Sequence, residues 1–201
     1  FRSFSTPHGG GGPGAGPVGV SRNLEPFLPV PRVSKRGEVF TLDRSFPYSV
    51  GKVHAFQGNF AVIVRAYSYI RALGPEGLKR VAEIAVLNAN YMKEKLKHRY
   101  HLPYDRICQH EFVLDDSEMP NHVTTNDIAK RLIDYGFHPP TVYFPLIVPG
   151  AMMIEPTETE SRETMDAFIA AMMQIREESE TDPEKVKTAP HTAPRKRLDA
   201  V

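Results

Sequence analysis

A glycine-rich segment, residues 7–17, constrains this chain more than any other stretch of its sequence. Its eleven residues include six glycines and three prolines. Glycine loses much backbone entropy in a helix and proline lacks a backbone N–H, so the segment is predicted to be a loop. Such a loop allows the backbone to approach another group very closely. The apolar residues 18–20 that follow are predicted to form a short strand that leaves the loop.

Three kinds of site could use such a loop. Gly14, Gly16 and Gly19 match the dinucleotide-binding pattern, but that pattern requires a preceding strand and a following helix, and this context is wrong. The run His8–Gly11 resembles the oxyanion loop of lipases and esterases, yet the chain has no G-x-S-x-G nucleophile elbow. The loop could also bring backbone amides close to a phosphate or a planar cofactor. This third interpretation and a tight loop packed on another subunit stay open.

The composition excludes several broad classes of protein. The chain has 201 residues, of which 41% are hydrophobic and 24% are charged, so global disorder is excluded. A net charge of +1 disfavours a protein that coats nucleic acid. The sequence contains no apolar run long enough for a membrane span. A single cysteine, Cys108, cannot form an internal disulfide, which indicates a reducing compartment.

Two helices are predicted in the middle of the chain. Apolar residues recur with helical spacing from Phe60 to Ile70, and Gly74-Pro75 is predicted to end this helix and to begin the next. The second helix, over residues 75–97, is about 35 Å long at about 1.5 Å per residue, which is enough to connect two domains. Lys93 is assigned to its solvent-facing side.

The C-terminal half alternates strand and helix signals. Strands are predicted over residues 107–114, 141–144 and 151–154. A capping box at residues 124–127 predicts a helix that ends at Gly136, and a last helix is predicted from Thr157. The polar, proline-containing tail from Thr181 is expected to be extended.

Other candidate functional residues have plain structural explanations. His98 and His101 have a metal-like spacing, but no further ligand lies nearby in the sequence, so they are assigned to the solvated surface and no metal site is expected. Cys108 and His110 would point to opposite faces of a strand and would form no dyad. Arg65, on an otherwise apolar helix, could bind a carboxylate through two hydrogen bonds, although an ion-paired or snorkelling arginine is the commoner case.

Several runs of this chain together resemble one family. The residues 3–20 resemble the segment around the cofactor lysine in the P-protein of the glycine cleavage system. Further runs resemble the same family in the same order, namely residues 58–60, 64–67, 85–91, 110–114, 134–141, 153–161 and 189–192. The run Ile154–Glu160 and the tail favour the second, cofactor-carrying subunit of the two-subunit form.

The resemblance implies an α/β chain that forms the C-terminal part of a fold type I subunit dependent on pyridoxal phosphate. Residues 1–74 would be the end of the large domain, 75–98 a connecting helix, 99–180 a small domain with a mainly antiparallel sheet, and 181–201 an extended tail. It also implies decarboxylation of glycine, in which the cofactor acts as electron sink and the aminomethyl group passes to the lipoyl arm of H-protein. The implied partners are subunit 1 of the P-protein, H-protein and glycine, with no nucleic acid and no membrane. The implied location is the bacterial or archaeal cytoplasm, with mitochondria also open.

The resemblance also assigns roles to individual residues. Ser3, His8 and the glycines Gly9, Gly10, Gly11 and Gly12 would lie near the cofactor. Arg65, singled out above by its place on an apolar helix, is the candidate for binding the glycine carboxylate. Arg2 occupies the position of the lysine that forms the Schiff base in the family. A guanidinium stays protonated and is a poor imine-forming nucleophile. A non-catalytic fragment or degenerate copy is therefore the alternative function, and exposed apolar surface is expected in residues 1–74 because their sheet neighbours are not in this chain.

Overall fold

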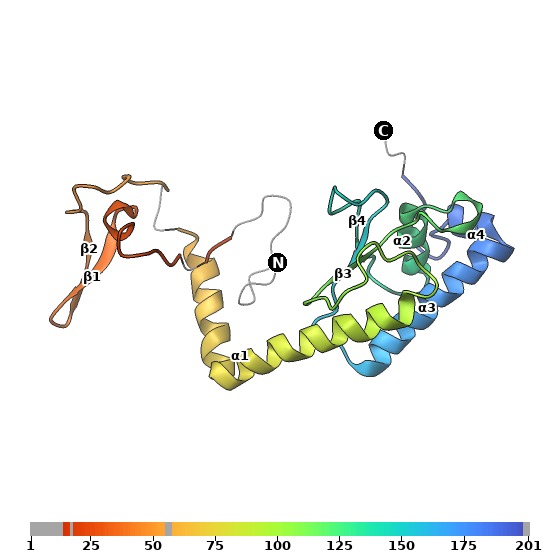
Figure 1. Ribbon diagram of the computed structural model, residues 1–201, viewed down its shortest axis with the longest axis horizontal. Helices are drawn as coiled ribbons and strands as arrows, with labels where there is room; N and C mark the ends of the chain where they lie inside the picture. Colours follow the sequence, from red (N-terminus) through yellow and green to blue (C-terminus); the bar gives the residue numbers. More distant parts are fainter. Residues whose placement is uncertain (1–13, 17, 55–57, 199–201) are drawn as a thin grey trace. The chain divides into compact units, whose positions relative to one another are not determined.

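The computed structural model describes residues 14–16, 18–54 and 58–198 (Figure 1). The chain divides into two compact units, Phe1–Leu78 (unit 1) and Lys79–Val201 (unit 2). Helix α1, Phe60–Leu96, contributes residues to both units and is interrupted at Gly74. Gly74 has a φ of 64°, a conformation that disfavours any side chain, and Pro75 then begins the second helical segment. The predicted break at Gly74-Pro75 is confirmed.

Unit 1 contains little regular structure besides the first segment of α1. A 3₁₀ turn, η2 (Glu25–Phe27), precedes a two-stranded antiparallel hairpin of β1 (Arg32–Arg36) and β2 (Val39–Asp43). The register pairs Val33 with Leu42 and Lys35 with Phe40. The strand expected at residues 18–20 is not formed, because these residues pair with no strand in the described part of the chain, and they are exposed.

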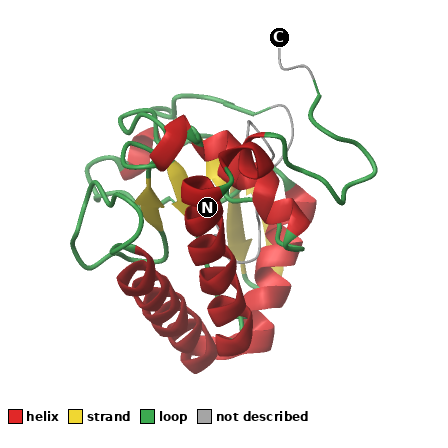
Figure 2. Ribbon diagram, turned by 90° about the vertical axis from the view of Figure 1, so that its right-hand side faces the viewer, coloured by secondary structure: helices red, strands yellow, loops and turns green. Residues whose placement is uncertain are grey.

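Unit 2 is a small α/β domain. Its sheet has the order β3-β5-β4, with β3 at Phe112–Leu114, β4 at Thr141–Val142 and β5 at Met152–Ile154, and both pairings are antiparallel. Helices α2 (Thr125–Asp134), α3 (Arg162–Thr181) and α4 (Pro183–Lys187) complete it, with a 3₁₀ turn η3 at Pro120–His122. Figure 2 shows helices packed over the strands, and α2 contacts both β4 and α3. The expected α/β class with a mainly antiparallel small sheet is confirmed.

The hydrophobic core of the described residues lies in unit 2. Every member of its buried cluster is Ala89 or a later residue. The cluster draws on the second segment of α1, on β3, β5, α2, α3 and α4, and its largest fully buried side chains include Tyr100, Leu96, Leu114, Ile128, Leu132, Met152, Met172 and Ile175. Tyr100 Oη donates a hydrogen bond to the Met172 carbonyl at 2.7 Å, which ties the segment that follows α1 to α3.

Two expectations for unit 2 are corrected by the structure. Residues 181–201 are not simply extended, because Pro183–Lys187 form α4. Asp182 caps this short helix by accepting a hydrogen bond from the Lys185 N–H, and Val186 is fully buried. The last long helix begins at Arg162 rather than near Thr157, because Ser161 provides its N-cap while the Thr157 carbonyl accepts a hydrogen bond from Asn88 at 2.8 Å.

Two hydrogen bonds of Thr125 join the loops around the sheet. Thr125 N–H donates to Asp116 Oδ2 at 2.8 Å, and Thr125 Oγ1 donates to the Gly150 carbonyl. Gly150 has a φ of 63°, and a Cβ at this position would overlap the Asp116 carboxylate at 1.9 Å. Only glycine fits here, so the start of α2 and the approach to β5 are held together.

Candidate functional site

Most of the candidate site from the sequence lies outside the described residues. Arg2, Ser3, His8, Gly9, Gly10, Gly11 and Gly12 all belong to residues 1–13, which the structure does not describe. The described end of the glycine-rich segment is held by Asn59, whose Nδ2 donates to the Gly14 carbonyl at 2.6 Å. Gly16 and Gly19 face open space, since a Cβ added at either position would have no other atom within 4 Å. These two glycines therefore form no close cradle for a ligand.

Arg65 lies on the first segment of α1 and is exposed to solvent. Its neighbours on the same helix, Val64 and Tyr67, are also exposed. No ion pair joins Arg65 to an acidic side chain in the part of the chain that the structure describes.

Unit 2 contains a buried lysine that the sequence pattern does not indicate. Lys93 is predicted to face solvent, but its side chain is only 3% exposed. Its Nζ donates to the Arg106 carbonyl at 2.6 Å and lies 3.2 Å from Glu94 and 3.9 Å from Asp105. The lysine can be buried because the Arg106 carbonyl accepts a hydrogen bond from its ammonium group. Helical periodicity cannot indicate this partner, which lies 13 residues farther along the chain.

The loop that follows α1 is pinned at a second point. Asn90 Nδ2 donates to the Cys108 carbonyl at 2.8 Å, and Asn90 Oδ1 accepts from the Cys108 N–H at 3.1 Å. Burial raises the pKa of the Cys108 thiol, so it stays protonated at neutral pH and is a poor nucleophile. That Cys108 and His110 form no catalytic dyad stays a prediction.

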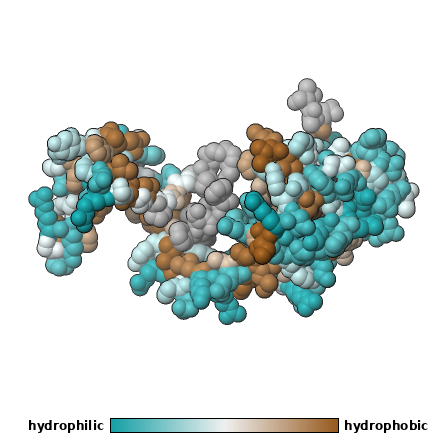
Figure 3. All heavy atoms as spheres, viewed as in Figure 1, coloured by the Kyte–Doolittle hydropathy of each residue, from teal (hydrophilic) through white to brown (hydrophobic). Residues whose placement is uncertain are grey.

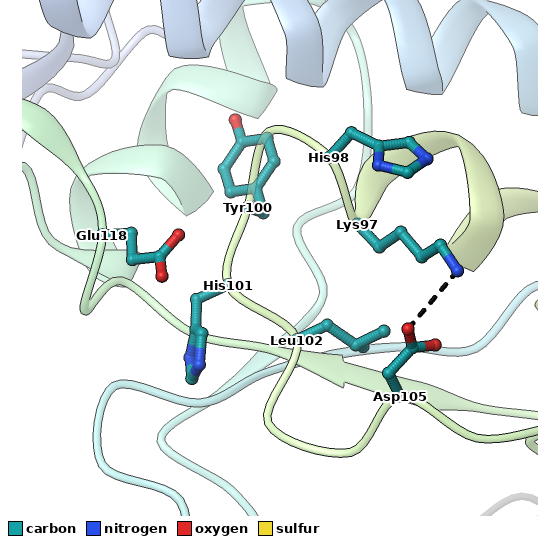
Figure 4. A pocket seen from close by; sticks show the side chains of 7 residues that line it. All are labelled: Lys97, His98, Tyr100, His101, Leu102, Asp105 and Glu118. Atoms are coloured by element: carbon teal, nitrogen blue, oxygen red, sulfur yellow. Dashed lines mark hydrogen bonds and ion pairs between the residues drawn. The ribbon is translucent and has the colours of Figure 1, made fainter.

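A shallow pocket of about 370 Å³ lies at the end of α1. Its lining includes Lys97, His98, His101, Asp105 and Glu118 (Figure 4). Lys97 Nζ pairs with Asp105 at 3.4 Å, and both side chains line the pocket. The rings of His98 and His101 point in different directions in Figure 4. Among residues 14–16, 18–54 and 58–198, no group of three His, Cys, Asp or Glu side chains could hold a metal ion.

His101 is oriented by a buried carboxylate. Its Nδ1 lies 2.8 Å from Asp115 Oδ2, while Asp115 Oδ1 accepts hydrogen bonds from the Ser117 N–H and hydroxyl. Burial acts to raise the pKa of Asp115, but these hydrogen bonds outweigh it and lower the pKa. The pair connects residue 101 to the strand end at 115, where the two backbones also form a β-bridge.

A buried ionic cluster joins α2, α3 and α4. Arg131 binds Glu178 through two hydrogen bonds, Nε to Oε2 at 2.9 Å and Nη2 to Oε1 at 3.0 Å. Lys185 Nζ and Tyr135 Oη reach the same carboxylate at 2.7 and 3.0 Å. Burial would raise the pKa of Glu178, but these partners prevail and lower it to about 2. The partners are up to 47 residues apart, so no local sequence pattern indicates the cluster.

Asp134 holds the C-terminal segment against α2. Its Oδ1 accepts from the His191 N–H at 2.6 Å, the Thr192 N–H at 2.8 Å and the Thr192 hydroxyl at 2.9 Å. Its Oδ2 accepts from Arg131 at 2.8 Å. Burial acts against ionisation, yet these hydrogen bonds lower the pKa of Asp134 to about 2. A second contact joins Arg197 to Asp127 at 2.6 Å.

These clusters link different elements of unit 2 to one another. Each cationic or acidic side chain in them is bound to another part of the same unit. In the part of the chain that the structure describes, no helix is both long and apolar enough to span a membrane.

Comparison with known protein families gives one clear match. The family described as "Glycine dehydrogenase, C-terminal domain" matches residues 81–194. That range covers most of unit 2, including all three strands of its sheet and helices α2, α3 and α4.

Curated relatives are similar over the whole chain. A probable glycine dehydrogenase (decarboxylating) subunit 2 of Caldanaerobacter subterraneus subsp. tengcongensis is 58% identical over 201 residues, which are 100% of this chain and 41% of the relative. Proteins of the same name from Listeria monocytogenes and Fervidobacterium nodosum are each 57% identical, over 98% and 100% of this chain and 41% and 42% of the relatives. The chain thus spans about two fifths of the length of these relatives.

One solved structure is also similar in part. It is a glycine decarboxylase (P-protein) of the glycine cleavage system in inhibitor-bound form. The match has a TM-score of 0.49 and 22% identity, and it covers 60% of this chain and 27% of that one.

Proposed function

The chain belongs to the glycine dehydrogenase C-terminal domain family, and we propose that it supplies the C-terminal part of a glycine dehydrogenase (decarboxylating) subunit. The single observation that carries this proposal is 57–58% identity to curated subunit 2 proteins along essentially the entire chain. Under this proposal, residues 1–74 complete a large domain, 75–98 connect the domains, and the remainder forms the small domain with its tail.

The proposed reaction is the decarboxylation of glycine by the complete enzyme. The aminomethyl group that remains is transferred to the lipoyl arm of H-protein, and CO₂ is released. The relatives are named as subunit 2, which supports a partner subunit 1. The bacterial origin of these relatives and the single cysteine of this chain support a reducing bacterial cytoplasm as the location.

Pyridoxal phosphate is the proposed cofactor of the complete enzyme, where it would stabilise the carbanion formed on decarboxylation. The described residues do not form a site for it. Gly16 and Gly19 face open space, and the buried Lys93 is bound to a carbonyl and two carboxylates. The proposed contacts of Ser3, His8 and Gly9, Gly10, Gly11 and Gly12 concern residues outside the described part.

Arg65 is the described residue proposed to bind substrate. An exposed guanidinium can hold a carboxylate through two parallel hydrogen bonds, which fits glycine. In the complete enzyme, Arg65→Ala is expected to raise KM for glycine at least tenfold with a smaller change in kcat. Arg71→Ala, on the same exposed helix, is the matched control and should leave KM within twofold.

A second candidate function is a non-catalytic copy, and Arg2 is the observation that favours it. The family position for the Schiff-base lysine holds an arginine here, and arginine does not form the imine at neutral pH. This copy would retain the scaffold of unit 2 without the chemistry.

Changing Arg2 to lysine separates the two candidates. The chain would be placed in a complete subunit with subunit 1 and lipoylated H-protein, and exchange of labelled CO₂ with the glycine carboxyl would be measured. Activity that appears only with Arg2→Lys identifies this sequence as a degenerate copy. Activity with Arg2 itself would show that another residue bears the cofactor, whereas inactivity of both forms counts against the glycine dehydrogenase proposal.

A further inference from the structure

The described end of the glycine-rich segment lies against the start of α1. Asn59 directly precedes this helix, and its Nδ2 donates to the carbonyl of Gly14, 45 residues earlier in the chain, at 2.6 Å. Gly14 and Ala15 are half-buried, whereas Gly16 and Val18 are exposed. Asn59 therefore holds the less exposed end of the described part of the segment.

This part of the chain has few means of its own to keep a fixed position. Residues 14–16 and 18–20, which the structure describes, form neither helix nor strand. The glycines have no side chain to pack, and Pro13 and Pro17 have no backbone N–H to donate. Glycine also loses more conformational freedom than any other residue when it is ordered. A segment of this kind is fixed by contacts that other elements make with its backbone.

Asn59 is itself held by the helix that it begins. Its carbonyl accepts the first helical hydrogen bond, from the Ile63 N–H at 3.0 Å, so Asn59 occupies the N-cap position of α1. Gly58 precedes it with a φ of 93°, a conformation that disfavours any side chain. The backbone on both sides of Asn59 is thus set by the turn into the helix, and its short side chain presents the amide at a defined place.

The use of asparagine at this position points to the contact with Gly14 rather than to the helix. Asparagine, aspartate and serine are about equally favourable at an N-cap. Among the three, only asparagine carries an N–H group, since a carboxylate has no donor and the serine hydroxyl is one bond shorter. A helix cap alone would not require the amide, whereas the hydrogen bond to the Gly14 carbonyl does.

We propose that Asn59 is a positioning residue of the proposed decarboxylation, whose side-chain amide anchors the glycine-rich segment to the first turn of α1. The assignment rests on the proposed function, which places that segment near the cofactor, and it gives Asn59 no contact with substrate or cofactor. Arg65 follows on the same helical segment, over which Figure 3 shows apolar side chains at the surface. The anchor and the residue proposed to bind glycine therefore belong to one helical segment, which links the position of the glycine-rich segment to that of the substrate.

The anchor is tested first by its effect on the segment itself, without an activity assay. NMR relaxation of the full chain gives order parameters for the amides of Ala15 and Gly16. In the unchanged chain we expect values above about 0.7, and in Asn59→Asp values below about 0.6, which mark flexible backbone. Ser68→Ala is the matched control, because it removes a side-chain hydrogen bond to the Val64 carbonyl on the same helix, and it should leave both values unchanged.

A second test separates anchoring from helix capping. Asn59→Asp, Asn59→Ser and Asn59→Ala are each placed in the complete enzyme, in the Arg2→Lys form, and exchange of labelled CO₂ with glycine is measured. All three should lower kcat/KM for glycine at least about fivefold, the effect of losing one hydrogen bond worth about 1 kcal/mol. Aspartate and serine preserve the cap, so a capping role would lower the activity of Asn59→Ala alone.

Two results would overturn the inference. One is equal order parameters of Ala15 and Gly16 in the unchanged chain and in Asn59→Asp. The other is lost activity in Asn59→Ala together with normal activity in Asn59→Asp and Asn59→Ser. If no form of the complete enzyme exchanges CO₂, that failure counts against the proposed function, and the order parameters still decide whether Asn59 anchors the segment.

Discussion

At the scale of single residues, the most consequential side chain is Glu178. It is buried and receives hydrogen bonds from Arg131, Tyr135 and Lys185. Replacing it with glutamine removes the charge that balances the buried Arg131 guanidinium. Removing one partner of a buried ion pair costs about 3–5 kcal/mol, and we expect Glu178→Gln to lower the free energy of unfolding by about 3 kcal/mol in urea titrations. The adjacent, exposed Glu177→Gln should change it by less than about 0.5 kcal/mol. Equal effects of the two substitutions would contradict this account.

The same cluster predicts how stability depends on pH. The pKa values of Glu178 and Asp134 are each lowered to about 2, from ordinary values of 4.5 and 3.8. A carboxyl whose pKa is lower in the folded state stabilises that state above its unfolded pKa, and this stability is lost as the pH falls toward the folded pKa. We expect the free energy of unfolding to decrease steadily between about pH 5 and pH 2. The decrease should be shallower in Glu178→Gln, and an identical slope in both proteins would exclude Glu178 as a source.

Individual residues also show where sequence reasoning stops. Helical periodicity places Lys93 toward solvent, but a lysine can be buried when a distant carbonyl, here that of Arg106, accepts from it. The Arg131–Glu178 pair is equally invisible in the sequence, because its partners lie on different helices. Arg2 shows the opposite case, since its chemistry is evident from sequence while its surroundings lie outside the described residues.

At the scale of secondary-structure elements, the sequence predicts helix boundaries best where the interactions that set them join residues close in sequence. Helix α2 begins with the predicted capping box, in which Asp127 N–H donates to Thr124 Oγ1 and Thr124 N–H donates to Asp127 Oδ2. The break at Gly74 is predicted equally well, because glycine conformation and proline chemistry act within a few residues. The short helix α4 is not predicted, since a tail rich in polar residues gives no indication that Val186 is buried.

The capping box of α2 gives a direct test at this scale. Thr124→Ala removes the hydroxyl that accepts from Asp127 N–H, and N-cap losses of this kind cost about 1 kcal/mol. We expect that decrease in the free energy of unfolding from urea titrations of the full chain. Thr124→Ser keeps the hydroxyl and should recover most of the stability. If serine and alanine were equally destabilising, the role of the cap would be refuted in favour of lost contacts of the Thr124 methyl group.

At the scale of the whole molecule, the two units differ in what holds them together. The buried cluster belongs entirely to residues from Ala89 onward, whereas the described part of unit 1 buries no side chain. The sequence resemblance predicts exposed apolar surface in the first 74 residues, and the exposed Val33, Phe40 and Phe60 confirm this expectation. The assignment of unit 1 to a larger domain stays a prediction, because its contacts would come from polypeptide beyond this chain.

This difference predicts the outcome of truncation. A chain of residues 79–201 retains the core cluster, so its free energy of unfolding should lie within about 1 kcal/mol of that of the full chain. Removing residues 183–201 instead deletes Val186 and Ala189, both fully buried, and the hydrogen bonds that His191 and Thr192 donate to Asp134. Lost burial at about 0.8 kcal/mol per methylene-sized group, together with the hydrogen bonds lost from the Asp134 carboxylate, which would keep only Arg131, should lower stability by at least about 2 kcal/mol. Chemical unfolding followed by circular dichroism measures both. A large loss on removing residues 1–78, or none on removing the tail, would mean that the folded state depends on unit 1 and not on the core of unit 2.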